Sequence, residues 1–320
     1  AQLGGSKQRR EEIRATLIDA TSRDVLPGAS VLVLRNDEIV LDEAFGIANP
    51  DERPFGPDEV CRVASISKPI TATLIAILVD RGVLTFDDPL DKHLPEFASA
   101  RLASGQSVRA PTIRELLSHT SGLPANKDRT RNDTPSTASG SLEDVVREIV
   151  TAGFATPPGT TYAYSRLGYD VAARVAEVAG GRPFETLLRD ELLVPLGMTA
   201  TTFRPSAELL AGMPRRYEPR DPGFEPGPEA RAPIAEYINS AGGLFTTADD
   251  LAAVIRLHLN AGRHGGRAIV REATLREMYR PQPAAPDYGL GFQLDRIVDG
   301  EARRLRHGGG IGTLLWFDRD

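Results

Sequence analysis

The chain has 320 residues, of which 41% are apolar and 26% are charged, and its formal net charge is −6. A chain of this length buries one large core or two modest ones. The mild acidity argues against nucleic acids and anionic membrane surfaces as partners. The best apolar stretch, residues 70–79, is too short for a transmembrane helix, so we expect no membrane span.

Cys61 is the single cysteine, which excludes an intrachain disulfide and leaves the redox compartment open. The chain opens with "AQLGGSKQRR" and no methionine, which suits either a processed export signal or a chain trimmed at its N-terminus. We expect a periplasmic or secreted protein, with the cytoplasm as the alternative.

Local patterns predict a series of strands, helices and loops in chain order. Residues 30–46 hold two β-rich runs around Asn36 and Asp37, which is typical of a hairpin. Apolar residues spaced by three and four predict a helix over residues 66–79, ended near Gly82. Thr112 and Glu115 form a capping box for a short helix reaching residue 118.

The rest of the chain alternates between helices and polar loops before it ends in strands. We expect two long loops at residues 124–140 and 214–233, because both are polar and rich in turn residues. Further helices are predicted around residues 171–180, 183–193 and 247–261, and the segment from residue 288 onward is β-like.

Strands at both ends with helices between them predict an α+β fold. We expect one antiparallel sheet, flanked by helices and built from the N- and C-terminal parts, with an inserted, mainly helical region. The predicted domains are residues 1–62 with 245–320 for the sheet, and residues 63–244 for the helical part with its active-site loops.

The stretch "RVASISKPIT" places Ser65 at the start of the first long helix and Lys68 one turn later on the same face. Negative charge that develops at a helix start is stabilised by the backbone N–H groups and the helix dipole. A lysine whose pKa is lowered can take the hydroxyl proton and make the serine a nucleophile. The alternative is a capping serine followed by a solvated lysine.

Three further stretches favour the catalytic interpretation: "TYAYSRLGYD" from residue 161, "RHGGGIG" from residue 306 and "LLSHTSGLP" from residue 116. Together with "SISK" they resemble the serine β-lactamase and penicillin-binding-protein superfamily, particularly its class C-like esterase and peptidase branch. The phrases "SAGGLFTTADDLA" and "PLGM" are also similar to that family, and the resemblance covers nearly the whole chain.

The resemblance implies a β-lactamase/DD-peptidase-like fold and an acyl-enzyme mechanism. Ser65 would attack the carbonyl carbon, Lys68 would act as general base, and Tyr164 would relay the proton. The N–H groups of Ser65 and Gly310 would bind the oxyanion. His307, where many relatives carry lysine, would orient Tyr164 or contact a substrate carboxylate.

Glycines at residues 308–310 would let a substrate approach the strand edge closely, with Gly309 lining the binding site; the alternative is a plain turn. The alternative for Tyr164 is that it is an aromatic side chain of the core. The sequence favours a structural role for His119, as an anchor of the loop after its helix.

Two departures from the family pattern affect the expected substrate. Arg166 stands where Tyr-x-Asn would place asparagine, and arginine offers only donors and a permanent charge. It would either bind a substrate carboxylate or turn away to a structural pair. The chain also stops at Asp320, so the family's last strand and C-terminal helix are expected to be absent, which leaves a missing covering segment or self-association as alternatives.

Other hydrolase classes lack their signatures in this sequence. Gly-x-Ser-x-Gly, required by α/β-hydrolases, does not occur, and the five histidines are too scattered for a zinc site. We therefore expect a serine hydrolase without cofactor or metal, a β-lactamase-related carboxylesterase acting on small ester or amide substrates. The alternatives are a D-stereospecific peptidase or β-lactamase, and a penicillin-binding sensor or scaffold that is acylated without turnover.

Overall fold

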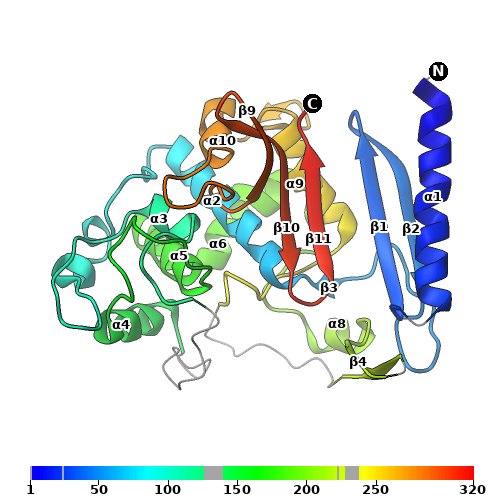
Figure 1. The fold of residues 1–320 in the computed structure, drawn as a ribbon, viewed down its shortest axis with the longest axis horizontal. Helices are drawn as coiled ribbons and strands as arrows, with labels where there is room; N and C mark the ends of the chain where they lie inside the picture. The colour runs from blue at the N-terminus through cyan, green and yellow to red at the C-terminus, as the bar shows by residue number, and fades with distance from the viewer. Residues whose placement is uncertain (1, 24, 126–139, 222, 228–237) are drawn as a thin grey trace. The chain divides into compact units, whose positions relative to one another are not determined.

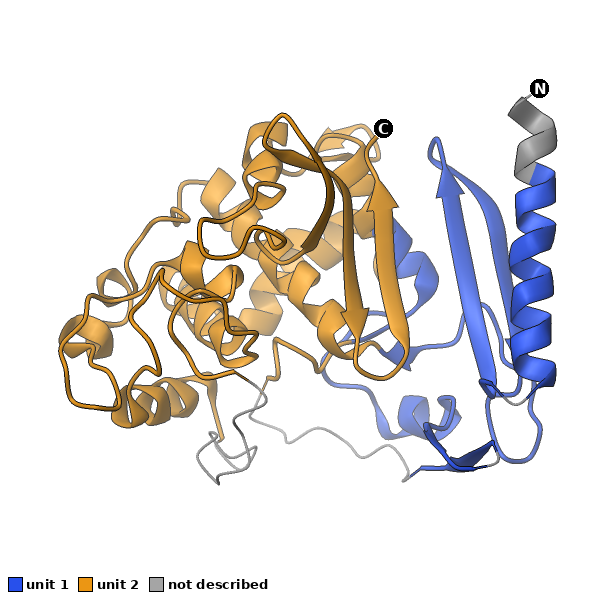
Figure 2. Ribbon diagram, in the orientation of Figure 1, with its two compact units in different colours: residues 1–62, 200–232, 245–253 blue, residues 63–199, 233–244, 254–320 orange. Residues whose placement is uncertain are grey.

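The computed structural model describes the chain apart from residues 1, 24, 126–139, 222 and 228–237. The chain folds into two compact units (Figure 2). Unit 1 comprises residues 1–62, 200–232 and 245–253, and unit 2 comprises residues 63–199, 233–244 and 254–320. The predicted domain boundaries stay a prediction. The expected loop at residues 124–140 lies almost entirely outside the described residues, as does the end of the loop at 214–233.

Unit 1 is built on a hairpin covered by the first helix, α1 (Gln2–Ser22) (Figure 1). Strands β1 (Gly28–Arg35) and β2 (Glu38–Gly46) pair in antiparallel fashion. Asn36 and Asp37 both have positive φ, 50° and 70°, which is the conformation of a tight hairpin turn. The predicted hairpin is therefore confirmed.

The remaining elements of unit 1 are short. Strand β3 (Cys61–Arg62) pairs with β6 (Phe245–Thr246), and β4 (Tyr217–Pro219) pairs with β5 (Phe224–Pro226). The carboxylate of Asp250 accepts hydrogen bonds from the Thr201 hydroxyl at 2.7 Å and the Ala200 N–H at 2.9 Å. Unit 1 also contains the helix α8 (Ala207–Gly212) and the first half of α9 (Ala248–Leu259).

Unit 2 is organised around the helix that the Ser-x-x-Lys pattern predicts. A 3₁₀ turn, η1 (Ala64–Ile66), leads into α2 (Ser67–Asp80), and Pro69 lies in the first turn, where the missing N–H is tolerated. Every side chain of α2 from residue 67 to 78 is buried. The helix packs against α5 (Leu167–Gly180) and α10 (Glu272–Met278), so the residues at its start are held rigidly.

The other helical elements of unit 2 surround α2. The described residues include η2 (Leu90–Lys92), η3 (Pro95–Ser99), α3 (Ile113–Leu117), α4 (Leu142–Ala152), α6 (Phe184–Leu188), a π-helical turn η5 (Arg189–Leu193) and α7 (Val194–Leu196). None of the described helices in the chain is long and apolar enough to cross a membrane.

A three-stranded antiparallel sheet ends the chain, in the order β11-β10-β9 (Figure 1). Its strands are β9 (Gln293–Val298), β10 (Glu301–Gly309) and β11 (Thr313–Asp318), and a further small hairpin joins β7 (Arg263–His264) to β8 (Arg267–Ala268). The fold is α+β, as predicted. Within the described residues this sheet and the β1–β2 hairpin are each hydrogen-bonded internally, and their union into one sheet stays a prediction.

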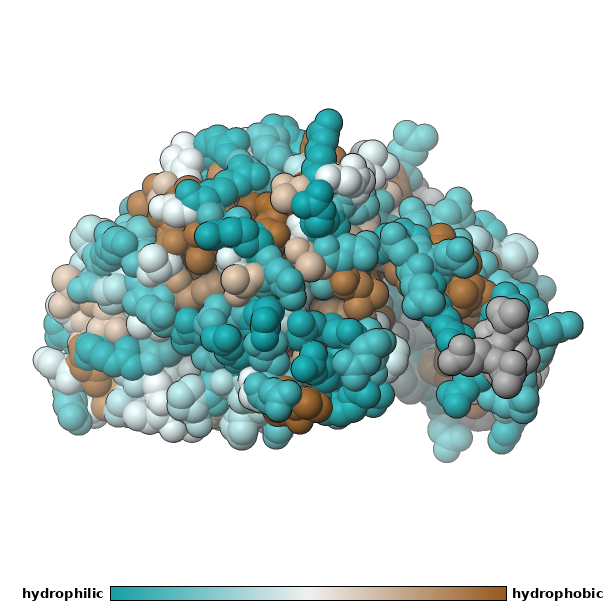
Figure 3. All heavy atoms as spheres, turned by 90° about the horizontal axis from the view of Figure 1, so that it is seen from above, coloured by the Kyte–Doolittle hydropathy of each residue, from teal (hydrophilic) through white to brown (hydrophobic). Residues whose placement is uncertain are grey.

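Hydrophilic side chains cover most of the face seen in Figure 3, and apolar residues appear there only in small scattered groups. Scattered exposed apolar side chains are normal for a folded chain.

Candidate active site

Ser65 and Lys68 meet at the start of α2. The Lys68 amine lies 3.1 Å from the Ser65 hydroxyl oxygen and 2.8 Å from the carbonyl oxygen of Ala241. Lys68 is only 1% exposed, whereas Ser65 keeps partial access to solvent. Ala64, directly before the serine, has a positive φ of 46°, which is unusual for a residue other than glycine. The predicted pairing of serine and lysine is thus present as a hydrogen bond.

Burial lowers the pKa of Lys68 to about 7. The Arg166 guanidinium adds to this effect, and the Asp170 carboxylate opposes it. A desolvated ammonium group loses hydration that its surroundings do not fully replace, so the neutral amine is favoured. A lysine in this state can accept a proton near neutral pH.

Tyr164 completes the cluster. Its pKa is raised by burial, and a hydrogen bond with Ser65 partly opposes that rise. The Lys68 amine lies 4.9 Å from the centre of the Tyr164 ring. The structure therefore brings Ser65, Lys68 and Tyr164 together, and their catalytic roles stay predictions.

The β10–β11 hairpin docks on the chain just before Ser65. The Thr313 hydroxyl donates to the Val63 carbonyl at 2.9 Å. A Cβ atom added at Gly309 would lie 2.5 Å from the same carbonyl oxygen and 2.0 Å from the Thr313 hydroxyl. Only glycine permits this approach of the strand, whereas a Cβ at Gly308 or Gly310 would meet nothing within 4 Å. Gly310 as an oxyanion donor stays a prediction.

His307 lies on β10 and has protein partners at both ring nitrogens. Its Nδ1 lies 3.0 Å from the Gly308 carbonyl oxygen, and its Nε2 lies 3.0 Å from the Tyr288 hydroxyl. Because a carbonyl can only accept, Nδ1 carries the proton and Nε2 accepts from Tyr288. Burial, together with the Lys68 charge, lowers the His307 pKa to about 4, so the ring is neutral at pH 7. Its centre lies 6.2 Å from that of Tyr164, and its predicted role stays a prediction.

Arg166 immediately precedes α5 and is 9% exposed. Its Nη1 lies 3.5 Å from a carboxylate oxygen of Asp170, one turn along the helix. The other Asp170 oxygen accepts a 2.9 Å hydrogen bond from the Ser240 hydroxyl. Of the two alternatives for this arginine, the geometry favours the structural pair.

Sequence reasoning missed four residues of this site. Asp170 lies four positions after Arg166 and could have been found if the helix predicted around residues 171–180 had been started at Leu167, where it begins in the structure. Ser240 and Ala241 lie in the phrase "SAGGLFTTADDLA", which is similar to the family but gives no role to either residue by itself. Tyr288 carries no signal, since its bond to His307 depends on tertiary structure.

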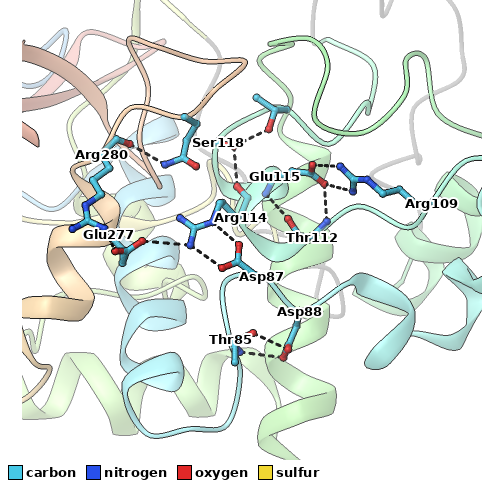
Figure 4. Close-up of polar contacts among 12 residues, drawn as sticks. Thr85, Asp87, Asp88, Arg109, Thr112, Arg114, Glu115, Ser118, Glu277 and Arg280 are labelled. Carbon is cyan, nitrogen blue, oxygen red and sulfur yellow. Dashed lines mark hydrogen bonds and ion pairs between the residues drawn. The ribbon is translucent and has the colours of Figure 1, made fainter. Parts of the chain in front are cut away.

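A polar network fixes α3 and the loop that follows it (Figure 4). Arg114 lies between Asp87, at 2.6 Å, and Glu277, at 3.4 Å. The predicted capping box is present: Glu115 accepts from the Thr112 N–H at 2.9 Å and its own N–H donates to the Thr112 hydroxyl at 3.2 Å. The loop starting at residue 118 therefore leaves a well-anchored helix.

The described residues contain no cluster of three or more histidine, cysteine, aspartate or glutamate side chains that could hold a metal ion.

This fold, with a serine and a buried lysine at the start of a central helix facing a tyrosine, defines a class of serine-dependent acyl-transfer proteins. The family model for beta-lactamase matches residues 13–320. The chain belongs to this family, and the resemblance noted in its sequence is confirmed.

Curated relatives include an esterase. The chain is 32% identical to Esterase EstB of Burkholderia gladioli over an alignment of 328 residues. The alignment covers 91% of this chain and 80% of the relative. It is 29% identical to Protein flp of Staphylococcus aureus strain MW2 over 180 residues, 56% of this chain. That match covers 35% of Protein flp, so it spans about a third of that relative's length.

Solved structures support the fold. EstCE1, described as a hydrolase with promiscuous acyltransferase activity, superposes with a TM-score of 0.85 at 22% identity, over 98% of this chain and 91% of its own. The octameric penicillin-binding protein homologue of Pyrococcus abyssi gives a TM-score of 0.75 at 22% identity, over 97% and 70% of the two chains.

Proposed function

We propose that this protein is a serine hydrolase that cleaves small ester substrates through an acyl-enzyme. The observation that carries the proposal is the buried Lys68, which has a pKa of about 7 and is hydrogen-bonded to the Ser65 hydroxyl. A structural lysine would gain nothing from burial beside a partly exposed serine, whereas a general base needs this environment. Similarity to Esterase EstB supports an ester as substrate.

The chemistry proceeds in two halves. Neutral Lys68 takes the proton of Ser65 as Oγ bonds to the carbonyl carbon, and the negative charge moves to the carbonyl oxygen. N–H groups of Ser65 and Gly310 stabilise that oxyanion. When the tetrahedral intermediate collapses, the alcohol leaves with a proton delivered through Lys68 and Tyr164. Water then attacks the acyl carbon and gives a proton to the same pair. The bond between Ser65 Oγ and the acyl carbon breaks as Oγ takes that proton back, which releases the acid and restores the free enzyme.

Esters are favoured over amides because Arg166, which stands where the family pattern has asparagine, pairs with Asp170. Arg166 is directed to Asp170, and no asparagine occupies the place where the family pattern holds a substrate amide. An amide N–H left unpaired on binding costs about 1–3 kcal/mol, which an ester avoids.

The rival from another class is a binding protein that keeps the fold without turnover, either as a sensor that is acylated or as a scaffold that is not. Hydrolysis of p-nitrophenyl butyrate and labelling by a fluorescent fluorophosphonate and a fluorescent penicillin separate the three cases. Steady turnover that disappears in Ser65→Ala supports the enzyme. A stable stoichiometric adduct with penicillin and no turnover indicates a sensor, and no label indicates a scaffold. Thermal unfolding of Ser65→Ala checks that the variant is folded.

Two further proposals concern where the protein acts and whether it self-associates. We propose export to the periplasm or the medium, which is tested by fractionating the producing cells. Self-association, for which the octameric homologue of Pyrococcus abyssi is a precedent, is tested by measuring the mass of the protein in solution.

A further inference from the structure

His119 follows the short helix α3 and lies at the centre of an aromatic group. It is 2% exposed, and its φ of 61° puts it in the left-handed region, where side chains other than glycine are uncommon. Its ring is surrounded by tyrosines at centroid distances of 4.4 to 5.9 Å, namely Tyr164, Tyr288, Tyr169 and Tyr162. A strained backbone held by its surroundings is more common at functional sites than elsewhere.

The residues on either side of Tyr164 each donate a backbone hydrogen bond to His119. The N–H of Ala163 donates to the His119 carbonyl at 2.8 Å. The N–H of Ser165 donates to the His119 ring nitrogen Nδ1 at 3.2 Å. His119 therefore holds the backbone on both sides of Tyr164, and its ring lies closest to the Tyr164 ring itself, at 4.4 Å.

The second bond requires a neutral imidazole whose proton is on Nε2, because only an unprotonated Nδ1 can accept. Burial is the main cause that lowers the His119 pKa well below its usual value, and the charges of Lys68 and His307 add to it. The ring is therefore an acceptor throughout the pH range in which Lys68 titrates.

An apolar ring of similar size would fill this site without burying a polar group. Among the described residues, His119 Nε2 has no hydrogen-bond partner, which costs free energy. What the imidazole supplies in return, and an apolar side chain could not, is the acceptor for the Ser165 N–H.

We infer that His119 is a positioning residue, which sets the Tyr164 phenol against Ser65 by clamping the backbone at residues 163 and 165. This goes further than anchorage of its own loop, the role that the sequence favours. It rests on the proposed function, because the quantity that His119 controls is the rate of proton relay by Tyr164.

The test compares His119→Asn with His119→Leu in the full chain. Asparagine reaches the Ser165 N–H with its side-chain oxygen and tolerates the left-handed backbone, whereas leucine keeps volume but offers no acceptor. Proton transfer by a positioned side chain is worth about 10²–10⁴-fold. We expect kcat for p-nitrophenyl butyrate to fall about 10–100-fold in the leucine variant with KM nearly unchanged, and the asparagine variant to recover most of it. If the leucine variant does not fold, His119→Gly removes the acceptor without backbone strain.

Both substitutions are repeated in a Tyr164→Phe background. This variant lacks the phenol hydroxyl, so the position of the ring at residue 164 no longer affects proton relay. We expect the leucine or glycine substitution to have little further effect on kcat there. An equal loss in both backgrounds overturns the inference, as does an asparagine variant that folds but is no more active than the leucine or glycine variant. Activity that survives Ser65→Ala would instead overturn the proposed function, so the two failures are distinguishable.

Discussion

The Lys68 amine is held by a 2.8 Å hydrogen bond to the carbonyl oxygen of Ala241, a residue 173 positions further along the chain. Because a carbonyl can only accept, this contact fixes one N–H of the lysine and directs its remaining bonding capacity towards Ser65, 3.1 Å away. In the neutral amine, the lone pair can then receive the serine proton. The geometry thus couples the charge state of one buried group to the reactivity of the hydroxyl beside it.

The first prediction concerns pH. With its pKa lowered to about 7 by burial, Lys68 is protonated and unable to act as base below that value. We expect kcat/KM for p-nitrophenyl butyrate to rise about tenfold per pH unit below 7 and to level off above it. The apparent pKa belongs to the coupled Lys68–Tyr164 pair. A flat profile from pH 5 to 9, with chemistry rate-limiting, would remove Lys68 from this role.

Replacing Asp170 by asparagine should move that profile to lower pH. The Asp170 carboxylate raises the Lys68 pKa, so its removal leaves the lowering effects of burial and Arg166 unopposed. Breaking a buried ion pair also costs about 3–5 kcal/mol of stability. The measurements are the pH–rate profile and urea unfolding; a profile displaced to higher pH would contradict the assigned electrostatics.

Arg166→Asn should displace the pH–rate profile in the direction opposite to Asp170→Asn. The Arg166 charge lowers the Lys68 pKa, so its loss should displace the profile to higher pH. Because Arg166 is directed to Asp170 and leaves a substrate amide without a partner, asparagine at this position should restore that partner. We therefore expect the ratio of kcat/KM for nitrocefin to that for p-nitrophenyl butyrate to rise by about tenfold, or about 1.4 kcal/mol. An unchanged ratio would mean that residue 166 does not contact the substrate amide and does not set the preference for esters.

Gly309→Ala should destabilise the protein, because its Cβ would lie 2.5 Å from the Val63 carbonyl oxygen. Overpacking of this kind costs about 1–3 kcal/mol, and here it would also push β10 away from Ser65. Gly308→Ala is the control on the same strand, since its Cβ would meet nothing within 4 Å. Thermal unfolding of both variants checks this; equal melting temperatures would show that β10 does not approach Val63 as closely as described.

Local patterns predicted the parts of the fold that local interactions determine. The helix after Ser65, the hairpin turn at Asn36 and the capping box at Thr112 depend on neighbouring residues and are all confirmed. Helix α1 was missed because its sequence has no apolar stripe. Helix α4 was also missed, although Ser141 caps it by accepting from the Asp144 N–H.

The supporting contacts of the site could not be predicted in the same way. The bond between Tyr288 and His307 and the clamp on Tyr164 join segments far apart in sequence. Spacing along a chain carries no information about such pairs. Arg166 and Asp170 are four residues apart and could have been paired had the predicted helix been started at Leu167.

The central claim is that Ser65 is the nucleophile, and covalent labelling tests it most directly. The protein is treated with a fluorophosphonate, digested, and the modified peptide sequenced by mass spectrometry, with Ser65→Ala as control. We predict one label per chain on Ser65, loss of p-nitrophenyl butyrate hydrolysis in step with labelling, and neither label nor activity in the variant. Loss of a serine nucleophile typically lowers kcat by about 10⁶-fold. A label on another residue that abolishes activity, or a variant that keeps more than about a tenth of the wild-type rate, would contradict it.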